Sequence, residues 1–428
     1  MRLDPKAGAV SVLSVPRDLL VPKFTFQGST YVDTKINFAY TIGSEYGHTP
    51  TAADKLALDV VKKALGNIVI NDFIDLNFAS FETVVAKLGC VYVDVDHFYY
   101  YHHNYAGEPA DQNYQAINIR PGYKSLCGNT ALAYVRYRRD DNTFARDARQ
   151  QDFLRQAKNQ LGVTGLLSHG QDILGAIGNS ITTSIHNATA VARLVNLALY
   201  TLGGPVRQIQ FPDNPIQIGS GDHQTATKAE IRNIVAQFEN SSPSTVTLPG
   251  SSTPPPSGAG GGGSSSSQHH VHHAHRAPAA VPGLVPTPSS MRTLALELAP
   301  QLPLEVELPM LSSAWAAQTG QQYDYYAHQL RDLAGHPHWS YHITWADTQA
   351  AGAYCGIEGT TWTSPPLFEH ADTRYYGGRA YAEVGNGHHI QDIGWIDHGV
   401  LYWINNTLFD ALTNAQIVAM AQSARPSS

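Results

Sequence analysis

The hydrophobic and polar positions of the first 240 residues form alternating strand-like and helix-like patterns. An apolar run over residues 10–15 follows the turn signal Asp4-Pro5-Lys6-Ala7-Gly8 and predicts the second strand of a hairpin. Apolar side chains recur at helical spacing in six segments: residues 51–65, 81–88, 149–161, 170–184, 188–200 and 228–238. Strand-like runs lie between them, at residues 69–76, 90–95 and 207–211. This alternation predicts an α/β fold, an α+β layered sandwich with a mixed sheet and helices on both faces.

The last part of the chain has a different pattern. Three strand-like runs, over residues 379–384, 389–395 and 400–404, are separated by glycine-containing turns, which predicts an antiparallel meander. Thr413 then precedes an apolar helical pattern and is expected to cap a helix. We interpret residues 322–333 as a helix and residues 340–345 as a strand. The pattern predicts a small α+β domain.

Composition changes sharply between these two regions. Residues 241–290 are rich in Ser, Pro, Gly and His, which predicts a disordered linker between a first domain over residues 1–240 and a second over 291–428. Five histidines within residues 268–275 offer imidazoles to a transition metal. Nothing nearby fixes their geometry, so we interpret them as part of the linker.

The overall charge limits the possible partners. The chain of 428 residues has a formal net charge of −7, which argues against extended nucleic-acid binding and requires any anion site to be local. Its three cysteines form no CxxC motif and leave the redox compartment open. The sequence contains neither an apolar run long enough to span a membrane nor a signal peptide.

One stretch, residues 128–151, gathers arginines. If residues 134–138 are extended, Arg136 and Arg138 point to the same side, where two guanidinium groups suit phosphate oxygens. The alternative is a solvated charged turn, which is the usual role of such a run. Arg17 after the first strand and Arg146 near a helix start supply further cations. Converging arginines without an evident nucleophile indicate phosphoryl chemistry, beside which a divalent metal held by aspartates is expected.

Several ordered motifs accompany these arginines. They are Ser14-Val15-Pro16-Arg17-Asp18, Lys35-Ile36-Asn37 with Ala39-Tyr40, Phe81 with Leu88-Gly89, Ile117-Asn118 with Pro121-Gly122, Leu126 with Gly128, residues 131–138, and Arg146 with Arg149-Gln150-Gln151. This set, over roughly the first 160 residues, resembles the LytR–CpsA–Psr (LCP) family. The C-terminal segment resembles the appended domain of some actinobacterial members.

The resemblance implies a cell-envelope phosphotransferase. Family members move an anionic glycopolymer from a polyprenyl-pyrophosphate carrier to peptidoglycan, outside the cytoplasm and attached to the membrane by an N-terminal anchor. By this resemblance, Arg17, Arg136, Arg138 and Arg146 are the expected catalytic, phosphate-gripping residues. The expected substrate-binding residues are Asp18, Lys35, Asn37, Arg149 and Gln150. The family also implies Mg²⁺ and no nucleic-acid partner.

The sequence departs from the family pattern in several places. We expect the aspartates that bind Mg²⁺, and the anchor, to lie upstream of Met1 in a longer protein, so no metal ligand is assigned in this chain. Thr143 stands where the family has an aspartate, Ala145 where it has a glycine, and Cys90 where a second glycine is usual. Two alternatives to the transferase therefore remain: a non-catalytic polyprenyl-phosphate-binding protein and, more remotely, a transcriptional attenuator.

Overall fold

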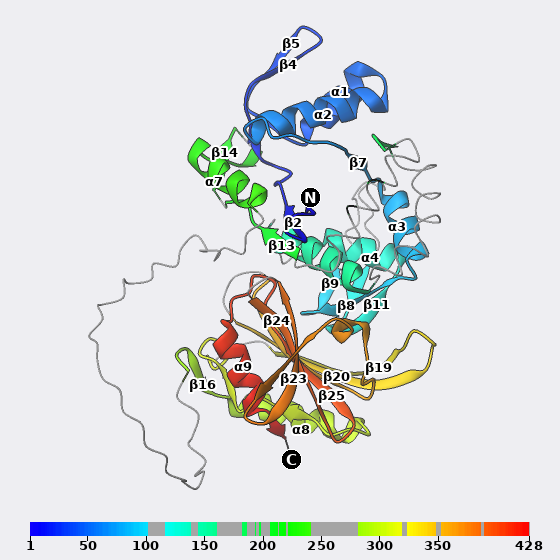
Figure 1. Ribbon diagram of the computed structural model, residues 1–428, viewed down its shortest axis with the longest axis vertical. Coiled ribbons are helices and arrows are strands. Elements are labelled where there is room, and N and C mark those ends of the chain that lie inside the picture. The colour runs from blue at the N-terminus through cyan, green and yellow to red at the C-terminus, as the bar shows by residue number, and fades with distance from the viewer. Residues whose placement is uncertain are drawn as a thin grey trace, which may run out of the picture.

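The computed structural model describes residues 1–101, 116–137, 144–160, 182–185, 193, 197, 206–212, 214–219, 221–240, 281–318, 323–347, 352–386 and 389–427. Figure 1 shows two lobes. We call the described residues within 1–240 the N-terminal lobe and those within 281–427 the C-terminal lobe. Within the described residues, no helix is both long enough and apolar enough to cross a membrane.

The N-terminal lobe is built from short strands in several small sheets. They are β1 (Arg2–Asp4), β2 (Ala9–Leu13), β3 (Leu20–Val21), β4 (Phe24–Phe26), β5 (Ser29–Tyr31), β6 (Thr34–Lys35), β7 (Ile74–Asp75), β8 (Val91–Val95), β9 (Tyr99–Tyr101), β10 (Ile117–Ile119), β11 (Gly122–Leu126), β12 (Thr182–Thr183), β13 (Val206–Ile209), β14 (Pro215–Ile218) and β15 (Gly221–Gln224). Strand β2 pairs antiparallel with β1 and parallel with β13, so this sheet is mixed.

Helices cover these sheets. They are α1 (Phe38–Gly47), α2 (Pro50–Ala64), α3 (Phe78–Lys87), α4 (Gly128–Arg136), a helix over residues 144–160, and α7 (Lys228–Glu239). Helix α2 begins where the Thr49 side chain accepts a hydrogen bond from the Ala52 amide. Gly43 allows α1 to approach α2 closely, because a Cβ there would lie 2.6 Å from the Cα of Ala53. The predicted α/β class is confirmed.

A disulfide that the cysteine spacing did not reveal joins two of these elements. Cys90 precedes β8, Cys127 is the N-cap residue of α4, and their Cα atoms are 4.6 Å apart. The third cysteine, Cys355, is buried and free.

The C-terminal lobe is organised around a seven-stranded antiparallel sheet of order β19-β20-β21-β25-β24-β23-β22. Its elements are β16 (Leu284–Pro286), α8 (Ser289–Leu298), η2 (Ala299–Gln301), β17 (Glu307–Leu308), β18 (Leu311–Ser313), β19 (Tyr323–Arg331), β20 (Pro337–Ala346), β21 (Tyr354–Thr360), η3 (Pro366–Phe368), β22 (Asp372–Tyr376), β23 (Arg379–Asn386), β24 (His389–Asp397), β25 (Val400–Asn405), α9 (Asn414–Ser423) and β26 (Arg425–Pro426). The predicted meander is confirmed in β23, β24 and β25. Strand β16 and the start of α8 lie within the last residues that the sequence assigns to the linker.

The two faces of this sheet differ in character because successive side chains on a strand point to opposite faces. On one face, Ile343, Trp345 and Ile357 pack in an apolar core with Met291 of α8 and Ile417 of α9. The other face carries polar and aromatic side chains, among them Ser340, His342, Thr344, Glu358 and Trp403, and this face contacts the N-terminal lobe.

Two predicted elements are wrong, and the strand predicted over residues 69–76 is reduced to the two residues of β7. Residues 134–136 form the last turn of α4 rather than an extended segment, and Ala131, Tyr134 and Val135 bury one face of that helix. Residues 323–331 form strand β19 rather than a helix, because they pair along their whole length with β20. The predicted helices over residues 170–184 and 188–200 fall largely outside the described residues. Within the first of these segments, the described residues Thr182–Thr183 form strand β12.

Candidate functional site

Three arginine-bearing segments of the N-terminal lobe lie side by side. The helix over residues 144–160 carries two consecutive glutamines that reach the other two segments. The Gln150 side-chain amide donates a 2.8 Å hydrogen bond to the carbonyl of Val135, next to Arg136. The Gln151 amide donates a 2.6 Å hydrogen bond to the Ser14 hydroxyl, three residues before Arg17. The structure therefore groups the segments that carry Arg17, Arg136 and Arg146.

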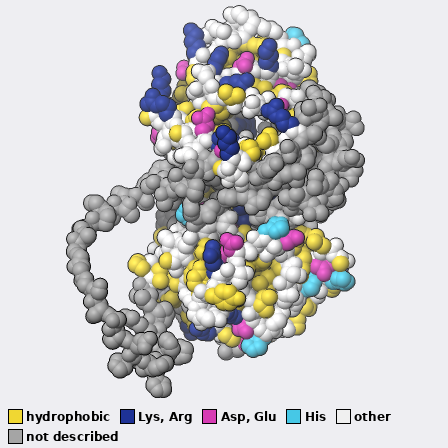
Figure 2. All heavy atoms as spheres, viewed as in Figure 1, with side chains coloured by type: hydrophobic (Ala, Val, Ile, Leu, Met, Phe, Trp, Pro, Cys, Tyr) yellow, Lys and Arg dark blue, Asp and Glu magenta, His cyan; other side chains and the backbone are white. Residues whose placement is uncertain are grey.

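Arg136 is the last residue of α4 and lies against an exposed aromatic ring. Its guanidinium carbon is 3.9 Å from the centroid of Phe78, within cation–π range. The Phe78 side chain is 56% exposed, and Ile74 and Leu76 just before it are also exposed. Figure 2 shows Lys and Arg side chains spread over the upper, N-terminal lobe beside exposed hydrophobic ones. A permanent cation thus lies next to exposed apolar surface.

Arg146 and Arg149 are held differently. Arg146 donates from Nε and Nη2 to Asp147 Oδ1, at 3.2 and 2.9 Å, and is largely buried. Arg149 is fully buried, donates to the Tyr137 carbonyl, and lies over the rings of Tyr99 and Tyr134 at 4.7 and 5.6 Å. Arg149, predicted as a substrate-binding residue, is therefore buried among aromatic side chains.

The remaining predicted residues lie at the entry to α1. Asp18 and Lys35 form an ion pair of 3.2 Å. Asn37 is the N-cap residue of α1, its side chain makes no capping bond, and its Oδ1 has no hydrogen-bond partner among the described residues. Arg17 is exposed, and its carbonyl accepts from the Asn37 amide at 3.4 Å. Arg138 and Thr143 lie outside the described residues.

Among the described residues, two carboxylates near these arginines are already paired with cations. Asp18 is paired with Lys35, and Asp147 with Arg146. In the part of the chain that the structure describes, the cluster with metal-ligand spacing lies elsewhere, at the junction of the two lobes.

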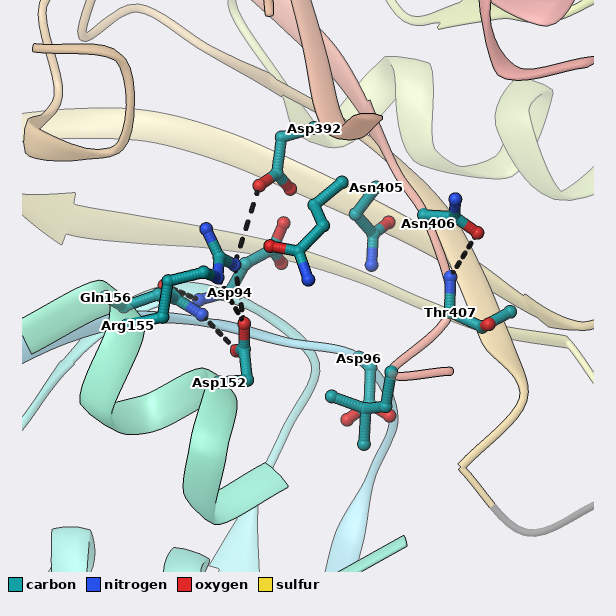
Figure 3. Close-up of a pocket in the computed structure, with 11 residues that line it drawn as sticks. Asp94, Asp96, Asp152, Arg155, Gln156, Asp392, Asn405, Asn406 and Thr407 are labelled. Atoms are coloured by element: carbon teal, nitrogen blue, oxygen red, sulfur yellow. Dashed lines mark hydrogen bonds and ion pairs between the residues drawn. The ribbon is translucent and has the colours of Figure 1, made fainter. Parts of the chain in front are cut away.

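That junction contains a buried polar pocket of about 30 Å³, shown in Figure 3. Asp152, Arg155 and Gln156 enter it from the helix over residues 144–160. Asp392 and Asn405 enter from the C-terminal sheet. Arg155 donates to Asp152 at 2.5 Å and lies 3.8 Å from Asp392, so it links the lobes.

Further hydrogen bonds cross the junction beside the pocket. The Tyr123 amide donates to both carboxylate oxygens of Glu358, at 3.0 and 2.8 Å. The Trp403 indole donates to Asp94 Oδ2 at 2.9 Å, and the Thr344 hydroxyl donates to the Asp96 carbonyl at 2.8 Å.

Burial shifts the acid–base equilibria of this junction. It raises the pKa of Asp94 to about 7, with the nearby Glu358 charge adding to the effect, and raises the pKa of Glu358 to about 8. Burial also lowers the pKa of Lys124 to about 8. We did not predict this site from the sequence. Its one visible signal is the pair Asp94 and Asp96, charged positions within an otherwise apolar strand and its end.

Comparison with known proteins identifies the family of the N-terminal lobe. The sequence model described as the LytR_cpsA_psr family matches residues 1–240. The polyisoprenyl-teichoic acid–peptidoglycan teichoic acid transferase TagV of Bacillus subtilis is 26% identical over 193 residues, which are 44% of this chain and 44% of that protein. TagU of Bacillus cereus, which carries the same transferase description, is 30% identical over 188 residues, 43% of this chain and 52% of that protein.

Among solved structures, the crystal structure of B. subtilis TagV matches with a TM-score of 0.44 and 21% identity, covering 57% of this chain and 87% of that one. The chain spans about half the length of the curated relatives it matches. The family match covers residues 1–240 of 428, more than half of the sequence, and the chain therefore belongs to the LytR_cpsA_psr family.

Proposed function

We propose that the protein is a cell-envelope phosphotransferase that moves an anionic glycopolymer from a polyprenyl-pyrophosphate carrier to peptidoglycan. The observation that carries the proposal is Arg136 stacked on exposed Phe78, which follows the exposed apolar residues Ile74 and Leu76 in sequence. A polyprenyl pyrophosphate has the matching chemistry, an anionic head joined to a long apolar tail. The transferase names of the relatives TagV and TagU agree with this assignment.

In the proposed reaction, a hydroxyl oxygen of peptidoglycan attacks the phosphorus that carries the glycopolymer. The new phosphodiester forms as the pyrophosphate P–O bond breaks, polyprenyl phosphate leaves, and the hydroxyl proton passes to solvent. Arg17, Arg136, Arg138 and Arg146 would bind the phosphate oxygens and offset charge that develops on them, which is the main requirement of phosphoryl transfer. Asp18 and Lys35, ion-paired beside Arg17, and Gln150 would position these cations.

Mg²⁺ remains part of the proposal on family grounds alone. The carboxylates of Asp18 and Asp147 are already paired with cations. This pairing favours, as the second candidate, a protein that binds polyprenyl phosphates without transferring the glycopolymer.

We further propose that the protein acts at the outer side of the cell membrane. The disulfide between Cys90 and Cys127 supports this location, since structural disulfides form and persist in oxidising compartments.

The test measures binding and turnover separately. Purified protein would be incubated with a polyprenyl-pyrophosphate-linked glycopolymer and peptidoglycan, and the release of polyprenyl phosphate would be followed. We expect Arg136→Ala and Arg146→Ala each to reduce turnover by about 10²–10³-fold, the effect of removing one preorganised charge donor.

Arg374→Ala, which removes an exposed arginine of β22, is the matched control and should leave turnover unchanged. Turnover that is insensitive to Arg136→Ala and Arg146→Ala would exclude the assigned site. Tight binding of the carrier lipid by the wild type, without any turnover, would establish the second candidate instead.

A further inference from the structure

Three buried side chains with metal-ligating atoms meet at the junction of the lobes. Asp94 of β8, His342 of β20 and Glu358 of β21 each offer one ligand atom, and these atoms lie within 4.8 Å of one another. The three residues are 7%, 0% and 1% exposed. We propose that they form a binding site for a divalent transition-metal ion such as Zn²⁺, which ties the C-terminal lobe to the N-terminal lobe.

The sheet positions two of the ligands. His342 and Glu358 are directly opposite each other in the β20–β21 pair, so their side chains share a face and meet. His342 Nδ1 lies 3.0 Å from Glu358 Oε2. Neighbouring ligands around an ion with bonds of about 2.0–2.2 Å are about 3 Å apart, so this separation fits a shared ion as well as it fits a hydrogen bond.

The third ligand comes from the other lobe and is held in place. Trp403, opposite Glu358 in the β21–β25 pair, donates its indole hydrogen to Asp94 Oδ2 at 2.9 Å. The second oxygen, Asp94 Oδ1, is buried and has no hydrogen-bond partner among the described residues. The tryptophan thus fixes the carboxylate and leaves one oxygen for an ion.

The environment of His342 is also typical of a metal-binding histidine. His342 Nε2 is buried and makes no hydrogen bond within the described part of the chain. A Cβ on Gly356 would lie 2.5 Å from this nitrogen and 2.9 Å from Asn405 Oδ1, so both atoms lie against the bare glycine. With Nδ1 on the ion, the Nε2 hydrogen would remain for the outer contact that metal-bound histidines usually make.

The donor set selects the kind of ion. Two carboxylates and one imidazole suit Zn²⁺ and similar first-row ions, whereas Mg²⁺ and Ca²⁺ prefer oxygen ligands alone. A divalent ion would neutralise both carboxylates. The nearby cation Lys124 lies over the Tyr326 ring at 5.6 Å and forms no ion pair with Asp94 or Glu358 among the described residues.

The experiment uses the full chain in a background that lacks the histidine-rich tract. The histidines of the 269–275 tract, a separate potential metal binder, are replaced: His269→Ser, His270→Ser, His272→Ser, His273→Ser and His275→Ser. This protein is stripped with a chelator and titrated with Zn²⁺, or with Co²⁺ to record its visible absorption bands. We expect one equivalent of tightly bound metal and a higher unfolding temperature with Zn²⁺.

His342→Gln and Asp94→Asn should each weaken binding by more than about 100-fold, beyond the loss caused by removing an outer contact. Asp94→Asn keeps an oxygen for Trp403 and its fold is checked by circular dichroism, so it remains informative if His342→Gln fails to fold. His336→Gln, in an exposed turn, should bind normally. Failure of the background protein to bind micromolar Zn²⁺, or unchanged binding by folded Asp94→Asn, would overturn the proposal.

Discussion

A single buried carboxyl, Glu307, makes the stability of the C-terminal lobe depend on pH. It accepts a 3.1 Å hydrogen bond from the Trp395 indole, and burial raises the pKa of Glu307 above its ordinary value. A carboxyl with a raised folded-state pKa holds its proton more tightly in the folded than in the unfolded chain. The free energy of unfolding therefore falls as pH rises from the ordinary glutamate pKa, about 4.3, through the folded value.

Glu307→Gln should remove this pH dependence. Glutamine keeps the shape and an acceptor for Trp395 but carries no charge, so the variant should unfold at a higher temperature than the wild type at pH 8. The difference should disappear near pH 4, where both proteins are uncharged at this position. Thermal unfolding across this range tests the prediction, and Glu305→Gln, an exposed neighbour, is the control. A variant less stable than the wild type at pH 8 would contradict it.

At the scale of elements, the sequence predicts a helix where an apolar stripe follows a cap, and it misses a strand that carries bulky side chains on both faces. In α2, Leu56 and Val60 recur at helical spacing behind a Thr49 cap, so pattern and cap agree. In β19, Tyr325 contacts the core while Tyr326 faces the N-terminal lobe, where it neighbours Arg120 and Lys124. Bulky side chains on both faces hide the two-residue alternation, and only the pairing with β20 fixes this segment as a strand.

The arginine site and the metal site at the junction also differ in how much of each the sequence reveals. The arginines of the first site stand within motifs whose order is visible along the chain. The second site joins Asp94 to His342 and Glu358, which are far apart in sequence and meet only because the lobes dock. No spacing rule links such residues, so this site could not be predicted from the sequence.

The disulfide is the element-scale feature with the largest expected effect on stability. Cys90 and Cys127 are separated by 37 residues and connect the start of β8 to the start of α4. Closing a loop of that length restricts the unfolded chain, so the Cys90→Ala, Cys127→Ala variant should lose about 4 kcal/mol of unfolding free energy. Urea denaturation measures this loss. A reductant should lower the stability of the wild type and leave that of the variant unchanged. Equal unfolding free energies for the wild type and the variant without reductant would refute the expectation.

At the scale of the whole molecule, the two lobes share an apolar cluster as well as a polar junction. Tyr92 and Tyr123 of the N-terminal lobe pack with Trp362, Leu367 and Trp403 of the C-terminal lobe. The Tyr123 hydroxyl also accepts from the Leu367 amide at 3.0 Å. Because burial on each side depends on the other, we expect the lobes to unfold together in one cooperative transition.

Arg155 is the side chain on which this cooperation can be tested. It is buried, pairs with Asp152 in its own helix, and lies 3.8 Å from Asp392 of the C-terminal sheet. Arg155→Met keeps much of the volume but leaves buried carboxylates without their counter-charge. Loss of one partner of a buried pair costs about 3–5 kcal/mol, so calorimetry should show a large fall in stability or a separate, earlier transition of the C-terminal lobe.

A second substitution separates the lost charge pairing from lost packing. Asp152 still accepts from the Gln156 amide, whereas Asp392 Oδ2 has no hydrogen bond within the described residues. Adding Asp392→Asn to Arg155→Met should therefore recover part of the loss, so that the double variant is more stable than the sum of the single effects predicts. Arg374→Met, at an exposed position, should cost little. Strict additivity of the two junction substitutions would mean that Arg155 and Asp392 do not couple the lobes.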